Sequence, residues 1–223
     1  MNAEKRRRFF EKLARANPAP RTELVFENPF QLLIAVLLSA QSTDKAVNAA
    51  TARFFPQVKT PADLVAMGEE ALAEHIKTIG LYRTKAKNAV ATARLLIERH
   101  GGAVPRTREA LEALPGVGRK TANVVLNCAF GESTFAVDTH VFRVANRTRL
   151  APGKTPLEVE RKLLRVTPRE FLSNAHHWLI LHGRYTCTAR APKCASCVVF
   201  EECEDRARHG RRREALAAKQ KAS

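Results

Sequence analysis

The stretch "LPGVGRKTANVVLNCAF", Leu114 to Phe130, decides the fold. Two glycines, Gly116 and Gly118, interrupt this stretch with one residue between them. Apolar residues recur at helical spacing before the glycines, from "REALEA" (108–113) onward, and after them. The pattern predicts a helix-hairpin-helix joined by Pro-Gly-Val-Gly. Glycines let the backbone take positive φ angles and come close to a ligand, and the free N–H groups that start the second helix favour an anion. The hairpin therefore predicts a phosphate contact.

The charge of the chain indicates what carries that phosphate. Lys and Arg number 38 against 22 Asp and Glu, a formal net charge of +16 over 223 residues. Residues 206–223 hold seven bases and one acid, so about +10 remains on residues 1–205. A folded part this basic predicts a polyanionic partner, a nucleic acid or an acidic membrane surface.

Membrane insertion is disfavoured by the same sequence. The most apolar run, "FQLLIAVLLSA" (Phe30–Ala40), has about half the length needed to cross a bilayer, so it predicts a buried helix. The first residues, "MNAEKRRRFFEKLARANP", lack the apolar core of a signal peptide. We therefore expect a cytoplasmic protein with no membrane partner.

The rest of the chain predicts helices throughout, and hence an all-α fold. Phe9 and Leu13 lie four residues apart in an N-terminal helix, and a longer helix places Ala86, Val90, Ala93 and Ile97 on one face before a Gly-Gly stop. Polar residues that cap further helices are Ser42, Thr60, Thr107 and Asp138. The one strand candidate, "TFAVD" (134–138), is short and isolated.

Lys120 and Asp138 each allow two interpretations. Lys120 stands at the start of the second hairpin helix, where it can contact a phosphate or, as a neutral amine, attack an electrophilic carbon and form a Schiff base. Asp138 can cap the helix that follows it or stabilise positive charge on a sugar. The sequence leaves both choices open.

Four of the five cysteines form a metal-ligand pattern. Cys187, Cys194, Cys197 and Cys203 have the spacing C-x6-C-x2-C-x5-C. Four thiolates so close together can hold zinc or a [4Fe-4S] cluster, and spacing alone does not separate the two. Either would staple the C-terminal loop to the body of the protein. The fifth, Cys128, lies on the apolar side of its helix and predicts a core residue.

These motifs together resemble the endonuclease III family of DNA base-excision repair glycosylases, within the helix-hairpin-helix superfamily. The resemblance spans roughly residues 4 to 205 and is carried by the cysteine pattern and by "LLSAQSTD" (37–44), "GLYRTKA" (80–86), "LPGVGRKTA" (114–122) and "VDTHV" (137–141). It implies two helical domains flanking a DNA-binding cleft. One is a six-helix domain over 22–132, and the other is an iron-sulfur cluster domain over 1–21 and 133–211. Residues 212–223 would form a disordered basic tail.

The resemblance also implies roles for individual residues. Lys120 would attack C1′ of a flipped-out damaged nucleotide, displace the base and leave an imine, after which β-elimination cuts the strand on the 3′ side. Asp138 would stabilise the developing positive charge, and the four cysteines would hold a [4Fe-4S] cluster rather than zinc. The implied DNA contacts are Gln41, Ile79, Leu81, Gly116, Val117, Gly118, Arg119 and, in the cysteine loop, Lys193.

The implied protein is a monomer that acts at the nucleoid on double-stranded DNA with abasic sites or oxidised or ring-saturated pyrimidines. An adenine-type monofunctional glycosylase is one alternative, but that branch lacks the Schiff-base lysine and uses a glutamate in the first central helix, where "PFQLLIAVLLSAQ" (29–41) contains no acid. A non-catalytic DNA-binding hairpin module is a second alternative. An abasic-site lyase with little glycosylase activity is a third, and it would share every motif.

Overall fold

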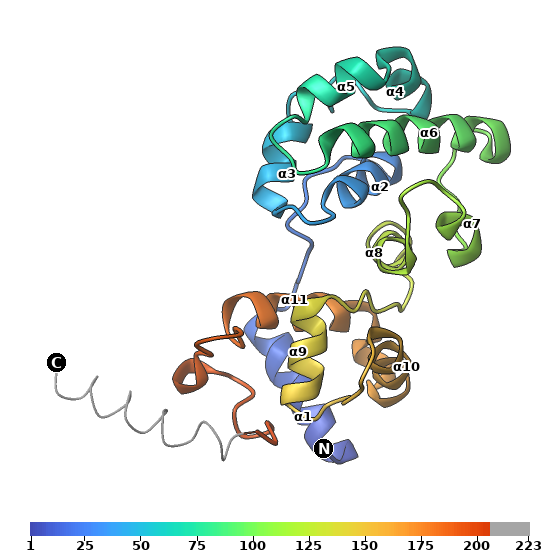
Figure 1. Cartoon of the computed structure of the whole chain (residues 1–223). Coiled ribbons are helices and arrows are strands. Elements are labelled where there is room, and N and C mark those ends of the chain that lie inside the picture. The colour runs from blue at the N-terminus through green and yellow to red at the C-terminus, as the bar shows by residue number, and fades with distance from the viewer. Residues whose placement is uncertain (206–223) are drawn as a thin grey trace, which may run out of the picture. The chain divides into compact units, whose positions relative to one another are not determined.

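The structure is a computed structural model that describes residues 1–205, and these residues form helices and connecting loops with no strand (Figure 1). The all-α prediction is confirmed. The strand candidate, residues 134–138, runs as a mostly buried segment without strand pairing. The chain divides into two compact units, Thr22–Glu132 and Met1–Arg21 with the residues from Ser133 onward. The predicted tail, 212–223, and the last predicted residues of the cluster domain, 206–211, lie outside the described residues.

The unit Thr22–Glu132 is built around one buried helix, α2. All but the first residue of α2 are buried, and α2 contacts α3, α6 and α8. Asn28 caps it by accepting a hydrogen bond from Gln31 N, and Pro29 occupies its first turn. The apolar run is therefore a core helix, as predicted. The helices of this unit are α2 (Pro29–Leu38), α3 (Asp44–Thr51), α4 (Pro61–Met67), α5 (Glu69–His75), α6 (Tyr82–His100), α7 (Arg108–Glu112) and α8 (Arg119–Phe130).

The resemblance implied six helices in this unit, whereas residues 22–132 form seven. One short break is at Gly68, which has a φ of +81° and lies between α4 and α5. A left-handed residue cannot continue a right-handed helix, so this glycine separates two short helices in place of one.

The other unit packs its helices around aromatic side chains. Phe9 and Phe10 of α1 are fully buried, and Phe171 stacks on Phe10 and meets Trp178 edge to face. Gly183 lies so close to α9 that an added Cβ would be 2.8 Å from His140 Cβ. The elements here are α1 (Ala3–Ala16), α9 (Thr139–Arg147), α10 (Pro156–Val166), η1 (Arg169–Phe171), α11 (Leu172–Tyr185) and η2 (Cys194–Ser196).

The observed N-cap residues can be compared with the four predicted ones. Thr60, Thr107 and Asp138 cap α4, α7 and α9 as predicted. The prediction of Ser42 was wrong by one residue, because Thr43 is the cap of α3 and Ser42 bonds elsewhere. Ile97 was also misplaced: it is 44% exposed, and Leu96 is the buried residue of that turn of α6.

No helix among residues 1–205 is both long and apolar enough to cross a membrane.

Candidate active site and DNA interface

The hairpin predicted from the glycines is present, with α7 and α8 joined by residues 113–118. Gly116 has a φ of +75°, and a Cβ there would lie 2.8 Å from Asn88 Nδ2. Thr92 donates a hydrogen bond to Pro115 O at 3.1 Å. Both partners belong to α6, so α6 fixes the shape of the hairpin turn.

Gly118 differs from Gly116 in conformation. Its φ is −96°, in the extended region open to any residue, so the expectation of a positive φ was wrong for this glycine. An added Cβ would meet nothing within 4 Å. Packing within the protein therefore does not require glycine here, and the open space beside Gly118 leaves room for a ligand to approach the backbone.

Lys120 is exposed in the first turn of α8. Its neighbour Arg119 is also exposed, and Gly118 provides no side-chain cap, so the first N–H groups of α8 receive no capping oxygen from it. Within residues 22–132 no ion pair involves the Lys120 amine. A reachable amine beside an uncapped helix start suits both an anionic ligand and nucleophilic attack.

Asp138 is the N-cap of α9, in the other unit. One oxygen, Oδ1, accepts hydrogen bonds from His140 N at 2.9 Å and Val141 N at 2.8 Å. The capping interpretation is therefore confirmed, and it holds the carboxylate in a fixed orientation. Among residues 1–205 no hydrogen bond to Oδ2 is present, so this oxygen remains available for a second role.

Gln41 and Leu81 share an unusual backbone conformation. Their φ values are 55° and 58°, and with Arg149 they are the only non-glycine residues with positive φ among residues 1–205. Both side chains are exposed, Leu81 by 63%. A large apolar residue in the left-handed region costs free energy, and such strain is concentrated at functional sites.

Ile79 and Val117 lie in the core of the same unit. Their exposed fractions are 3% and 5%, so their side chains pack against other apolar residues and do not face solvent. Their burial does not favour a side-chain contact with DNA, and a DNA contact by either residue stays a prediction. Apolar spacing could not distinguish a buried residue in a loop from an exposed one.

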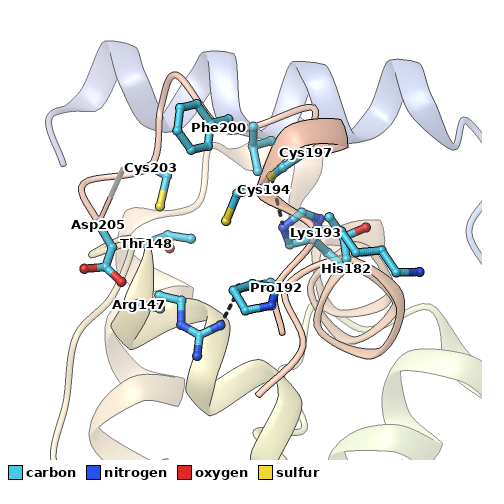
Figure 2. A pocket seen from close by; sticks show the side chains of 13 residues that line it. Arg147, Thr148, His182, Pro192, Lys193, Cys194, Cys197, Phe200, Cys203 and Asp205 are labelled. Atoms are coloured by element: carbon cyan, nitrogen blue, oxygen red, sulfur yellow. Dashed lines mark hydrogen bonds between the residues drawn. The ribbon is translucent and has the colours of Figure 1, made fainter. Parts of the chain in front are cut away.

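The four predicted cysteine ligands line one pocket in the C-terminal loop. Figure 2 shows the sulfur atoms of Cys194, Cys197 and Cys203 around the same space, with Arg147 and His182 at its border. The His182 ring lies 3.8 Å from Cys197 Sγ. Across residues 1–205, no three His, Cys, Asp or Glu side chains are placed as a ready-made set of ligands for a metal ion. The four cysteines therefore line one pocket, but their side chains are not arranged around a single ion.

Two cysteines of the pocket, Cys197 and Cys203, have raised pKa values that favour the thiol form. Burial raises the pKa of Cys197 to about 12, and the neighbouring cysteines raise it further. Burial also raises the pKa of Cys203 to about 11. Metal ligation requires thiolates, so a bound cationic centre would have to stabilise the thiolate charge together with Arg147 and Lys193, which also line the pocket. Four soft sulfur donors in one apolar pocket fit an iron-sulfur cluster chemically.

Two arginines of α9 hold the first cysteine segment. Arg143 donates to Cys187 O at 2.9 Å and to Gly183 O at 2.7 Å. Arg147 donates to Thr188 O at 2.8 Å and reaches Cys187 Sγ at 3.5 Å. The sequence analysis missed both arginines, although their spacing of four residues on one helix is a signal for a shared target.

Lys193, the predicted phosphate contact of the cysteine loop, is exposed and precedes η2. Its backbone N–H donates to Thr186 O at 2.9 Å, which fixes the loop while leaving the side chain in solvent.

Comparison with known proteins gives a consistent result. Residues 34–169 match the family described as HhH-GPD superfamily base excision DNA repair protein. Endonuclease III of Escherichia coli (strain K12) is 60% identical over 204 residues, covering 92% of this chain and 97% of that protein. Endonuclease III of Haemophilus influenzae is 58% identical over the same coverage.

Solved structures agree with the sequence relatives. A trapped endonuclease III–DNA covalent intermediate has a TM-score of 0.86 and 44% identity, covering 94% of this chain and 99% of that one. A non-covalent endonuclease III–DNA complex has a TM-score of 0.87 and also 44% identity, covering 95% and 99%.

Proposed function

The chain belongs to the HhH-GPD superfamily of base-excision DNA repair proteins and, within it, to the endonuclease III family, and on this premise we propose that Lys120 is its catalytic nucleophile. The protein is a DNA glycosylase and abasic-site lyase that binds damaged double-stranded DNA. The exposure of Lys120 in the uncapped first turn of α8 carries the proposal. A covalent DNA intermediate, as named for the related structure, requires such a nucleophile.

The reaction begins when the neutral Lys120 amine attacks C1′ of the damaged nucleotide. The C1′–N bond to the base breaks, and the base departs with the bonding electrons and takes up one proton from the amine. The C1′–O4′ bond of the sugar ring then breaks, O4′ takes up the second amine proton, and the imine forms between Lys120 and C1′. Loss of a proton from C2′ then drives β-elimination, which breaks the C3′–O bond and releases the strand on the 3′ side with a 5′-terminal phosphate. Water hydrolyses the remaining imine and frees Lys120.

Asp138 stabilises the positive charge that develops on the sugar and on the imine nitrogen. The cap contacts through Oδ1 support this role because they hold the carboxylate in place without neutralising it. Because the charge appears only as the base leaves, a fixed carboxylate stabilises the transition state more than the ground state.

The hairpin and two exposed loops hold the DNA. A phosphate approaches the backbone at Gly118 and the N–H groups of α8, with Arg119 beside them. The target nucleotide must leave the base stack, because C1′ is not accessible inside the duplex. Gln41 and Leu81, exposed and held in the left-handed conformation, enter the duplex and fill the vacated space.

The cysteine loop holds a [4Fe-4S] cluster through Cys187, Cys194, Cys197 and Cys203. The shared pocket and the all-sulfur donor set support a thiolate-bound centre, and the relationship to endonuclease III supports a [4Fe-4S] cluster over zinc. The four cysteines would hold the cluster, and the cluster would supply a staple that fixes this loop against the body of the protein, where Arg143 and Arg147 of α9 already bind the first cysteine segment. Lys193 then presents its charge to a DNA phosphate from a fixed loop.

The substrates are oxidised or ring-saturated pyrimidines, and the place of action is the nucleoid in the cytoplasm. No single sequence motif selects the lesion, so the family relationship is the support for this substrate class.

Borohydride trapping tests the proposal. Duplex DNA with one abasic site or one oxidised pyrimidine is incubated with wild type, Lys120→Ala or the control Lys77→Ala, whose lysine is ion-paired with Glu74. We expect a covalent complex and strand cleavage with wild type and the control, and neither with Lys120→Ala. Base release without trapping in wild type would assign the monofunctional alternative, and DNA binding without either would assign the non-catalytic module.

A further inference from the structure

One lysine of the unit 22–132 is buried without a carboxylate partner. Lys85, in the first turns of α6, is 5% exposed. Its Nζ donates a hydrogen bond to Ser42 Oγ at 2.9 Å, and no ion pair of this unit includes it. An ammonium has three donor hydrogens, so one neutral hydroxyl satisfies it only in part. The position of Lys85 is therefore costly.

Several other unfavourable features gather at the same helix start. The first turn of α6 has no acidic residue, and no side chain caps it. A cation near a helix N-terminus opposes the helix dipole, and burial lowers the pKa of Lys85. Leu81, the N-cap residue, is left-handed. Proteins keep such combinations where function requires them, because each one alone reduces stability.

Lys85 connects the two exposed residues that share the left-handed conformation. Its backbone N–H donates to Leu81 O at 3.0 Å, so its main chain is tied to Leu81. Its side chain is tied to Ser42, the residue after Gln41. Ser42 N in turn donates to Ser39 O at 3.0 Å, which joins this contact to the end of α2. The two loops, about 40 residues apart in sequence, thus meet through one side chain.

We propose that Lys85 is a positioning residue that holds the Gln41 loop and the Leu81 loop at one spacing, so that both side chains enter the duplex as a unit. The inference rests on the proposed function, in which Gln41 and Leu81 occupy the space left by the flipped nucleotide. A fixed spacing removes the need to order two independent loops during extrusion.

A double-mutant cycle measures this coupling. Gln41→Ala and Leu81→Ala, alone and together, are assayed for extrusion with 2-aminopurine opposite a tetrahydrofuran abasic analogue, and for single-turnover imine formation on an abasic duplex. Each variant has a fold-loss in extrusion and in the rate of imine formation. In the otherwise wild-type protein, the fold-loss of the double variant should be smaller, by about fivefold or more, than the product of the two single-variant fold-losses, a typical coupling for residues that act together. When Lys85 is also replaced by Met, the coupling should disappear, so the fold-loss of the double variant should equal the product of the two single-variant fold-losses.

Ser42 gives a second, independent pair of variants. Ser42→Ala removes the acceptor and should abolish the coupling as Lys85→Met does, whereas Ser42→Thr keeps the hydroxyl and should retain it. This pair decides the matter even if Lys85→Met fails to fold. Thermal unfolding of each variant separates lost stability from lost coupling, because a purely structural role would lower the melting temperature and leave the coupling unchanged.

Two different failures can be told apart. If Leu81→Ala and Gln41→Ala reduce extrusion but their coupling survives both Lys85→Met and Ser42→Ala, the positioning role of Lys85 is refuted and DNA insertion stands. If neither Gln41→Ala nor Leu81→Ala changes extrusion, the proposed DNA insertion is refuted, and the role of Lys85 with it.

Discussion

Replacing Gly116 with alanine is the change whose effect follows most directly from the hairpin geometry. Gly116 has a φ of +75°, and an added Cβ would lie 2.8 Å from Asn88 Nδ2 and 3.2 Å from Asn88 Cβ. A left-handed non-glycine residue costs roughly 1–2 kcal/mol, and Asn88 must also move, so we expect a loss of about 2 kcal/mol. For a chain of this length that lowers the melting temperature by about 4 to 8 °C.

Gly118→Ala is the matched control, two residues away in the same turn. Its φ of −96° suits alanine, and the new methyl group would meet nothing within 4 Å. The loss of a favoured N-cap residue should cost less than about 1 kcal/mol. The same methyl group would stand where we place the DNA phosphate, so this variant should fold normally and bind DNA more weakly.

Thermal unfolding by circular dichroism at fixed pH and salt measures the first effect, and fluorescence anisotropy on a duplex with a tetrahydrofuran abasic analogue measures the second. A melting temperature for Gly116→Ala equal to that of wild type would refute the conformational argument. So would a Gly118→Ala variant that unfolds at a lower temperature than Gly116→Ala.

Three further predictions concern the other functional and buried groups. Asp138→Ala removes two cap hydrogen bonds and should lose about 0.5–2 kcal/mol of stability, whereas Asp138→Asn keeps the cap but should still form the borohydride-trapped complex more slowly; trapping by Asn at the wild-type rate would contradict the charge role. Burial raises the pKa of Cys128 to about 12, so iodoacetamide should modify it far more slowly at pH 8 in the folded chain than in urea, as measured by mass spectrometry. Because the folded pKa lies above the usual value of about 8.5, the contribution of Cys128 to stability should be full below that pH and disappear as pH rises toward 12; equal modification rates in both states would exclude this burial. Cys194→Ser should reduce the bound iron and the melting temperature together, and unchanged iron content would count against this ligand.

Features encoded by neighbouring residues could be predicted from the sequence. The caps at Thr60 and Asp138 and the helix that starts at Pro29 depend on residues a few positions apart. The cysteine pocket was predictable for the same reason, because three of its four sulfurs come from one segment of ten residues, 194–203. Short-range chemistry therefore fixed most of the candidate site.

Contacts across long stretches of sequence could not be predicted in this way. Lys85 and Ser42 are 43 residues apart, and each alone has the appearance of an ordinary surface residue. Asn88, which makes glycine necessary at position 116, gives no local signal either. The burial of Ile79 and the exposure of Ile97 depend on which helix covers them, and helical spacing alone cannot decide this.

The most direct test of the central claim is to locate the covalent bond in the wild-type protein. Wild type is trapped with borohydride on a duplex containing one abasic site, the complex is digested with nuclease and trypsin, and the peptides are sequenced by mass spectrometry. We expect the reduced sugar adduct on Lys120, with tryptic cleavage blocked after that residue. An adduct on another lysine or on the N-terminal amine would contradict it.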